Sequence, residues 1–167
     1  MRACVGIAAV VTNARDMFES FLLATTMWVS PVQPMTVVRG FDAPSSSWGA
    51  GHRGVDLSAT AGTWVHAAGD GTVAFVGTIA GKEVVSIRHD TLTTTYEPVH
   101  AHVRINETVH VDDVIGVVTV AGGHCGGMVG CMHWGAKRGT TYLNPLALLG
   151  KAPIVLKPGR AGALGRR

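Results

Sequence analysis

Two histidines and one aspartate in this 167-residue chain have the types and spacing of a metal site. His52 and Asp56 lie in the run Gly-His-Arg-Gly-Val-Asp, where a turn through Gly54 would bring both side chains to one ion. His133, in Cys-Met-His-Trp-Gly, offers a third ligand. Catalytic zinc takes three such ligands and keeps a fourth position open for water, whereas structural zinc closes with four. The three residues predict an open site, although chance pairs of this spacing are common among eight histidines and eleven acids.

Three segments surround or separate the candidate ligands: Gly-Ala-Gly-His-Arg-Gly-Val-Asp-Leu (49–57), Gly-Thr-Trp-Val-His-Ala-Ala-Gly-Asp-Gly-Thr-Val (62–73), and Met-His-Trp-Gly (132–135). In type and order these segments, within about residues 37–150, resemble the lysostaphin/LytM-type (M23) zinc metalloendopeptidases. The resemblance implies an all-β or β-rich fold, with an antiparallel sheet of the peptidoglycan hydrolase type (LytM, duplicated hybrid motif). It also implies Zn²⁺ as cofactor and hydrolysis of peptide bonds in the bridge or stem of bacterial peptidoglycan.

Two positions depart from the family pattern. Members usually carry a second histidine two residues before the last ligand and another in a Tyr-x-His run, where this chain has Cys131 and Pro98. Imidazoles near a metal site orient water and stabilise developing charge, and losing one such group costs on the order of 10²–10⁴-fold in rate. Two hypotheses therefore stay open: a zinc metallopeptidase, or a non-catalytic module that binds peptidoglycan or activates another hydrolase.

Several residues are candidates for the missing roles. His124 is the candidate catalytic histidine, because a Cys125–Cys131 disulfide would hold it near the strand that carries His133. Alternatively, His124 is a loop histidine with no role. The other candidates are His100, His102 and Glu97 for proton handling, and Tyr96 and Trp48 for substrate binding.

Short apolar runs bounded by Gly, Asp, Asn or Pro predict many short strands. Their close spacing favours a sandwich or barrel-like packing of antiparallel sheets. One short C-terminal helix is expected over Asn144–Leu149, with Asn144 as N-cap and Pro145 at the first position. The expected strands are Thr63–His66, Thr72–Thr78, Val84–His89, Thr93–Tyr96, Thr108–Val111, Val114–Val120 and Cys131–Lys137.

The charge distribution argues against nucleic acid as the main partner. Residues 31–150 hold seven Lys/Arg against nine Asp/Glu, whereas residues 151–167 hold five basic residues and no acid. Phosphate-binding patches normally lie on the folded surface, which here is slightly acidic. We expect a monomeric domain over 31–150 and a basic flexible tail over 151–167 that is either solvated or contacts anionic envelope polymers or lipid head groups.

Residues 1–30 resemble a leader, with two apolar runs separated by charges. Neither run reaches the ~20 residues that cross a bilayer. Either Met17 is the true start of a cleaner signal, or the segment lies near a membrane. We expect export to the cell envelope or the medium, which fits a Cys125–Cys131 disulfide once Cys4 is removed. The opposite interpretation is a cytosolic protein with free thiols.

A third function class is a biotinyl- or lipoyl-type carrier, which the hairpin-like segment 106–118 resembles. Such a carrier needs an exposed lysine at the hairpin tip. No lysine lies between Lys82 and Lys137, so the sequence disfavours it.

Overall fold

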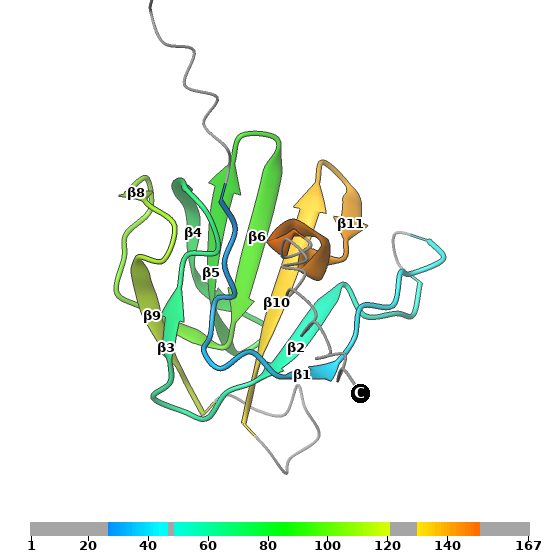
Figure 1. Ribbon diagram of the computed structural model, residues 1–167, viewed down its shortest axis with the longest axis horizontal. Coiled ribbons are helices and arrows are strands. Elements are labelled where there is room, and N and C mark those ends of the chain that lie inside the picture. Colours follow the sequence, from blue (N-terminus) through cyan, green and yellow to red (C-terminus); the bar gives the residue numbers. More distant parts are fainter. Residues whose placement is uncertain (1–26, 47–48, 121–129, 151–167) are drawn as a thin grey trace, which may run out of the picture.

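The computed structural model describes residues 27–46, 49–120 and 130–150, which form two antiparallel β-sheets (Figure 1). The larger sheet has eight strands in the order β1-β2-β10-β6-β5-β4-β8, with β11 paired to β10. The smaller sheet has the order β3-β9-β7. The strands of the larger sheet are β1 (Val37–Arg39), β2 (Gly54–Ser58), β4 (Gly71–Ile79), β5 (Lys82–His89), β6 (Leu92–Glu97), β8 (Thr108–Val109), β10 (Cys131–Arg138) and β11 (Thr141–Leu143). Those of the smaller sheet are β3 (Trp64–His66), β7 (Val99–Ala101) and β9 (Val114–Val118).

Strand β10 lies in the middle of the larger sheet, between β2 and β6. Its side chains alternate between the two faces, as in any strand. Met132, Trp134 and Ala136 are buried in the hydrophobic core. His133 and the alternate residues Gly135 and Lys137 therefore lie on the other face, so one strand joins the core to the candidate site.

The hydrophobic core lies between the two sheets. Val55 and Leu57 of β2 and Trp134 of β10 meet Val65 of β3 and Ile115 of β9, and all five are fully buried. Because β2, β10 and β6 all contribute to this core, the backbone that carries the candidate ligands is held rigidly.

The expected β-rich, antiparallel fold is confirmed, and all seven expected strands are present with shifted ends. The turn expected through Gly54 is wrong, because Gly54 opens strand β2 and pairs with Gly135 of β10. Four strands were not predicted from the sequence: β1, β2, β7 and β11. Three of these have only three residues, too few to show alternation clearly.

The expected C-terminal helix is present as a 3₁₀-helix, η1 (Pro145–Leu149). The side chain of Asn144 caps it by accepting a hydrogen bond from the Leu146 amide at 3.1 Å. The helix is a short terminal piece, and 3₁₀ geometry is used in proteins in short pieces of this kind. Leu146, Leu148 and Leu149 pack against the core, which fixes the end of the described chain.

The folded body begins earlier than residue 31. The Val29 amide donates to the Ala68 carbonyl at 2.9 Å, Ser30 is buried, and Trp28 packs against the core. The rest of the expected leader and the basic tail lie outside the described residues. Within the described ranges, none of the helical structure is long and apolar enough to cross a membrane.

Candidate metal centre and adjoining groove

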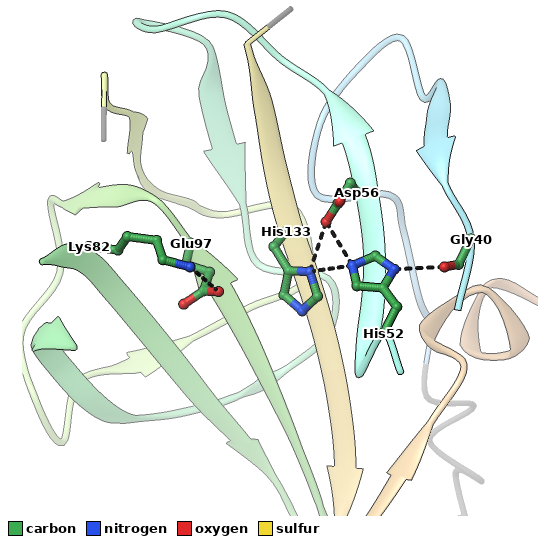
Figure 2. A network of polar contacts seen from close by, with 6 residues as sticks. All are labelled: Gly40, His52, Asp56, Lys82, Glu97 and His133. Atoms are coloured by element: carbon green, nitrogen blue, oxygen red, sulfur yellow. Dashed lines mark hydrogen bonds and ion pairs between the residues drawn. The ribbon is translucent and has the colours of Figure 1, made fainter. Parts of the chain in front are cut away.

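Three side chains from two neighbouring strands and the loop before β2 converge at one point (Figure 2). Asp56 lies on β2 directly opposite His133 on β10. His52 precedes β2, where a two-way backbone pairing with Asp42 fixes it: the amides of Asp42 and His52 donate to each other's carbonyls at 3.0 and 2.7 Å. All three candidate ligands are buried, with Asp56 completely so.

The contacts of His52 determine which of its nitrogens faces the cluster. Its Nδ1 lies 2.6 Å from the carbonyl oxygen of Gly40. A carbonyl oxygen only accepts, so Nδ1 must carry the hydrogen and donate it. In neutral His52, Nε2 then turns a lone pair toward Asp56 and His133. In metal-binding histidines, the ring nitrogen that does not bind the metal commonly donates such a hydrogen bond, which fixes the tautomer.

The donor atoms are close enough to share one cation. His52 Nε2 lies 3.0 Å from both Asp56 Oδ1 and His133 Nδ1, and His133 Nδ1 lies 2.8 Å from Asp56 Oδ1. One ligand atom from each residue can be chosen so that all lie within 4.8 Å of one another. Two imidazole nitrogens and a carboxylate oxygen form a donor set that suits zinc. The residues therefore fit a metal ion, with Asp56 supplying one negative charge.

Gly54 allows strand β2 to lie close to strand β10 beside the candidate site. A Cβ atom at this position would lie 2.3 Å from the Trp134 carbonyl oxygen and 2.6 Å from His133 Nε2. The pairing of β2 with β10 therefore requires glycine here. Its partner Gly135 is less crowded, because a Cβ there would approach no atom closer than 3.6 Å.

Residues 50–145 match the family "Peptidase family M23". The chain belongs to peptidase family M23. The match includes all three candidate ligands, and it confirms the resemblance drawn from the three motifs. The M23 domain is thus a peptidase-type domain of a family related to peptidoglycan hydrolysis.

A relative of this M23 domain is the uncharacterized protein Rv2891 of Mycobacterium tuberculosis. It is 49% identical over 131 residues, which cover 75% of this chain and 52% of the relative. The chain thus spans about half the length of that relative.

Two solved structures share the fold. A zinc-containing peptidase from Vibrio cholerae superposes with a TM-score of 0.61 at 19% identity, covering 71% of this chain and 38% of the other. The catalytic domain of lysostaphin from Staphylococcus simulans superposes with a TM-score of 0.60 at 18% identity, covering 70% of this chain and 93% of the other. At these identities the likeness concerns the fold, and it confirms the expected lysostaphin-type sheet.

A groove of about 180 Å³ in the M23 domain adjoins His133. Glu97, opposite His133 on β6, lines it and accepts from Lys82 Nζ at 3.2 Å. In Figure 2 this pair lies on the other side of His133 from Asp56 and His52. Glu97, which the sequence suggested for proton handling, therefore lies close to the candidate metal centre, and Lys82 already balances its charge.

Tyr96 does not line the groove, so its expected role in substrate binding is wrong. It alternates with Glu97 along β6 and points into the core, where it is fully buried. Its hydroxyl accepts from the Ala68 amide at 3.0 Å and from Thr94 Oγ1 at 2.9 Å. Burial raises the pKa of Tyr96 to about 12. Tyr96 is a packing residue that joins β6 to the loop after β3.

The structure does not bring His100 or His102 to the groove, so neither fits the expected proton-handling role. His100 lies on β7 of the smaller sheet, where its Nδ1 is 2.8 Å from Glu83 Oε1. His102 contacts the exposed Trp64 edge-on, with ring centroids 5.6 Å apart. His124, Trp48 and Cys125 lie outside the described residues, so their expected roles stay predictions.

Among the groove residues that were not predicted from the sequence are Arg53, Lys137 and Tyr142. Lys137 could have been found, because it lies four residues after His133 on an expected strand and so on the same face. Tyr142 reaches the groove through the β10–β11 pairing. The two-residue connection between these strands begins with Gly139, a turn signal that could have indicated the hairpin.

Proposed function

We propose that this chain is a zinc metallopeptidase domain of the bacterial cell envelope that hydrolyses peptide bonds in peptidoglycan. The observation that carries the proposal is the convergence of His52 Nε2, His133 Nδ1 and Asp56 Oδ1 in a buried cluster beside a groove. Membership of family M23 supports zinc as the ion and peptidoglycan as the substrate class.

Zinc, when bound, supplies a Lewis acid that acidifies water and polarises a peptide carbonyl. The residues of the chain supply the rest. Gly40 orients His52, and the core behind β2 and β10 holds Asp56 and His133 in place. The groove beside His133 positions the peptide, and such positioning supplies much of the rate acceleration of an enzyme.

The test is digestion of purified peptidoglycan by the full chain, measured as newly exposed amino groups. We expect zinc-dependent release that a chelator stops and that the His133→Ala protein lacks. Release that persists equally in the His133→Ala protein would contradict the proposed site.

A second function is favoured by Pro98 and Cys131, which replace the family's usual histidines. In that alternative the domain binds peptidoglycan, or activates another hydrolase, without cutting. Co-sedimentation with peptidoglycan but no release of amino groups would support it.

We infer that the mature protein is exported and that Cys125 pairs with Cys131. Cys131 is buried at the first position of β10 and is disulfide-bonded, which supports the pairing. An oxidising compartment is where such bonds persist, and peptidoglycan lies there too. Non-reducing mass spectrometry of a protease digest should find residues 125 and 131 in one cross-linked product. Two alkylatable thiols at these positions in exported material would refute the pairing.

A further inference from the structure

The groove beside the metal centre is built from three rows of residues that cross the sheet on one face. Antiparallel partners share a face, and successive rows are two residues apart along each strand. The first row is Asp56, His133 and Glu97, and the second is Gly54, Gly135 and Thr95. The third row joins Lys137 to Tyr142. The candidate centre lies at one end of this face and a lysine at the other.

The two glycines of the middle row leave the backbone of β2 and β10 uncovered by side chains. Gly54 and Gly135 pair with each other, and Gly135 lines the groove. A Cβ at Gly135 would lie 3.6 Å from both the Arg53 carbonyl oxygen and His133 Nε2, so the position has space for a methyl group. Glycine here is not required by packing, unlike glycine at 54. Because Gly135 has no side chain, the strand backbone is uncovered at this point of the groove, and an extended peptide can lie on it.

The far end of the groove carries two cations. Lys137 is exposed and forms no ion pair with any described residue. The guanidinium of Arg53 lies 5.4 Å from the centre of the Tyr142 ring and donates to the Gly49 carbonyl at 3.0 Å, which orients it. The one acidic residue that lines the groove, Glu97, is paired with Lys82. This end is therefore positively charged.

We propose that the groove selects acidic peptides, and that Lys137 and Arg53 bind a carboxylate of the peptidoglycan stem. The inference rests on the proposed function for the identity of the peptide. Lys137 is four residues from His133, or about 13 Å at 3.3 Å per residue. An extended peptide covers that distance in about four residues. The carboxylate would thus lie several residues from the bond held at the metal centre.

The experiment compares two forms of one stem peptide, with free carboxylates and with the same groups converted to carboxamides. Binding of both forms to the zinc-loaded full chain is measured by calorimetry, and their cleavage in parallel. We expect the free form to bind about tenfold more tightly, because a charge-assisted hydrogen bond contributes on that order. The preference should fall to about two- to threefold in Lys137→Gln and in Arg53→Gln, because each variant retains one cation.

Arg138→Gln is the matched control. It removes the same charge from the next position of β10, on the opposite face of the strand, and Arg138 is also exposed. It should keep the full preference. Gly135→Ala should weaken the binding of both peptide forms alike, because the added methyl group occupies space in the groove without changing its charge.

The outcomes separate this inference from the peptidase proposal. Equal binding of both forms, no binding of either, or an equal loss in Arg138→Gln would overturn carboxylate selection, whatever the cleavage result. Preferential binding that depends on Lys137 would support it even if neither peptide is cut. In that case the peptidase proposal would fail and the groove assignment would stand.

Discussion

Replacing His133 by alanine is expected to leave a folded protein that no longer retains zinc. The wild-type chain should hold about one zinc ion, because three ligands and an open position form one mononuclear site. Losing a residue that merely orients a ligand typically lowers metal affinity 10–100-fold, so losing a ligand itself should cost at least 100-fold. His52→Ala and Asp56→Ala should behave alike. Metal analysis after gel filtration measures the effect.

Thermal unfolding gives a second measurement of the same prediction. Zinc at about 100 times its dissociation constant would stabilise the wild-type protein by about 2.7 kcal/mol, and a chelator should remove that stabilisation. The His133→Ala protein should not respond to the chelator. His100→Ala is the control, because His100 also lies beside a carboxylate, at 2.8 Å from Glu83, but is exposed and away from the cluster. A metal content equal to wild type in all three ligand variants would overturn the site.

Gly54→Ala should also lose the metal although it changes no ligand. The added methyl group would collide with the Trp134 carbonyl oxygen and with His133 Nε2, so either β2 or the imidazole must move. Gly135→Ala, the same change at the facing position, meets only ordinary contacts and should keep its zinc. Full metal content in Gly54→Ala would show that the ligands tolerate displacement.

The fold was largely predictable because its central strands are long and bounded by turn residues. The strands β4, β5, β6, β9 and β10 each carry apolar or β-branched residues between turns, and short connections account for the pairing of β4 with β5 and of β5 with β6. Strand β2 was missed because its sequence is part of the Gly-rich ligand motif, which suggested a turn. Its course as a strand is set by pairing with β10, a partner about 80 residues away, which local patterns do not report.

The candidate site was predictable for a different reason. Its ligands are chemically distinctive residues, and the three motifs around them, in a recognisable order, indicated a metal centre more strongly than the ligand types alone. Tyr96 was misplaced because a strand-end tyrosine beside a glutamate can face either way, and only the register with Trp134 puts it in the core. Arg53 and Tyr142 were missed because they meet through tertiary packing, which no spacing encodes.

Hydrolysis by the wild-type chain is expected to be slow, because two proton-handling positions are altered. Cys131 lies two residues before His133 on the same face of β10, where it is buried and disulfide-bonded. Its sulfur therefore has no hydrogen to donate. Pro98 has neither a titratable side chain nor an amide hydrogen. Peptide cleavage still needs a donor to the developing oxyanion and a proton for the leaving amine.

The surrogate we expect is His124, and its replacement separates metal binding from catalysis. His124→Ala should keep the zinc but lose about 10²-fold or more of the residual rate of peptidoglycan cleavage. Lys137→Gln should instead change which peptide is preferred, so the two variants report on different steps. Rapid cleavage by the wild-type protein, undiminished in His124→Ala, would show that another group moves the proton.

Pro98→His is the complementary gain-of-function variant. A histidine at Cys131 would break the disulfide, so position 98 gives the cleaner test. The hydrogen bond that the Pro98 carbonyl accepts from the Thr119 amide, at 3.2 Å, uses only the backbone and is available to any residue. If the missing imidazole limits the rate, Pro98→His should raise cleavage by about 10-fold or more at unchanged zinc content, since one general acid–base group contributes about 10²–10⁴-fold when well placed. Zinc-loaded protein that cleaves in no variant, yet still binds peptidoglycan, would instead favour the non-catalytic module.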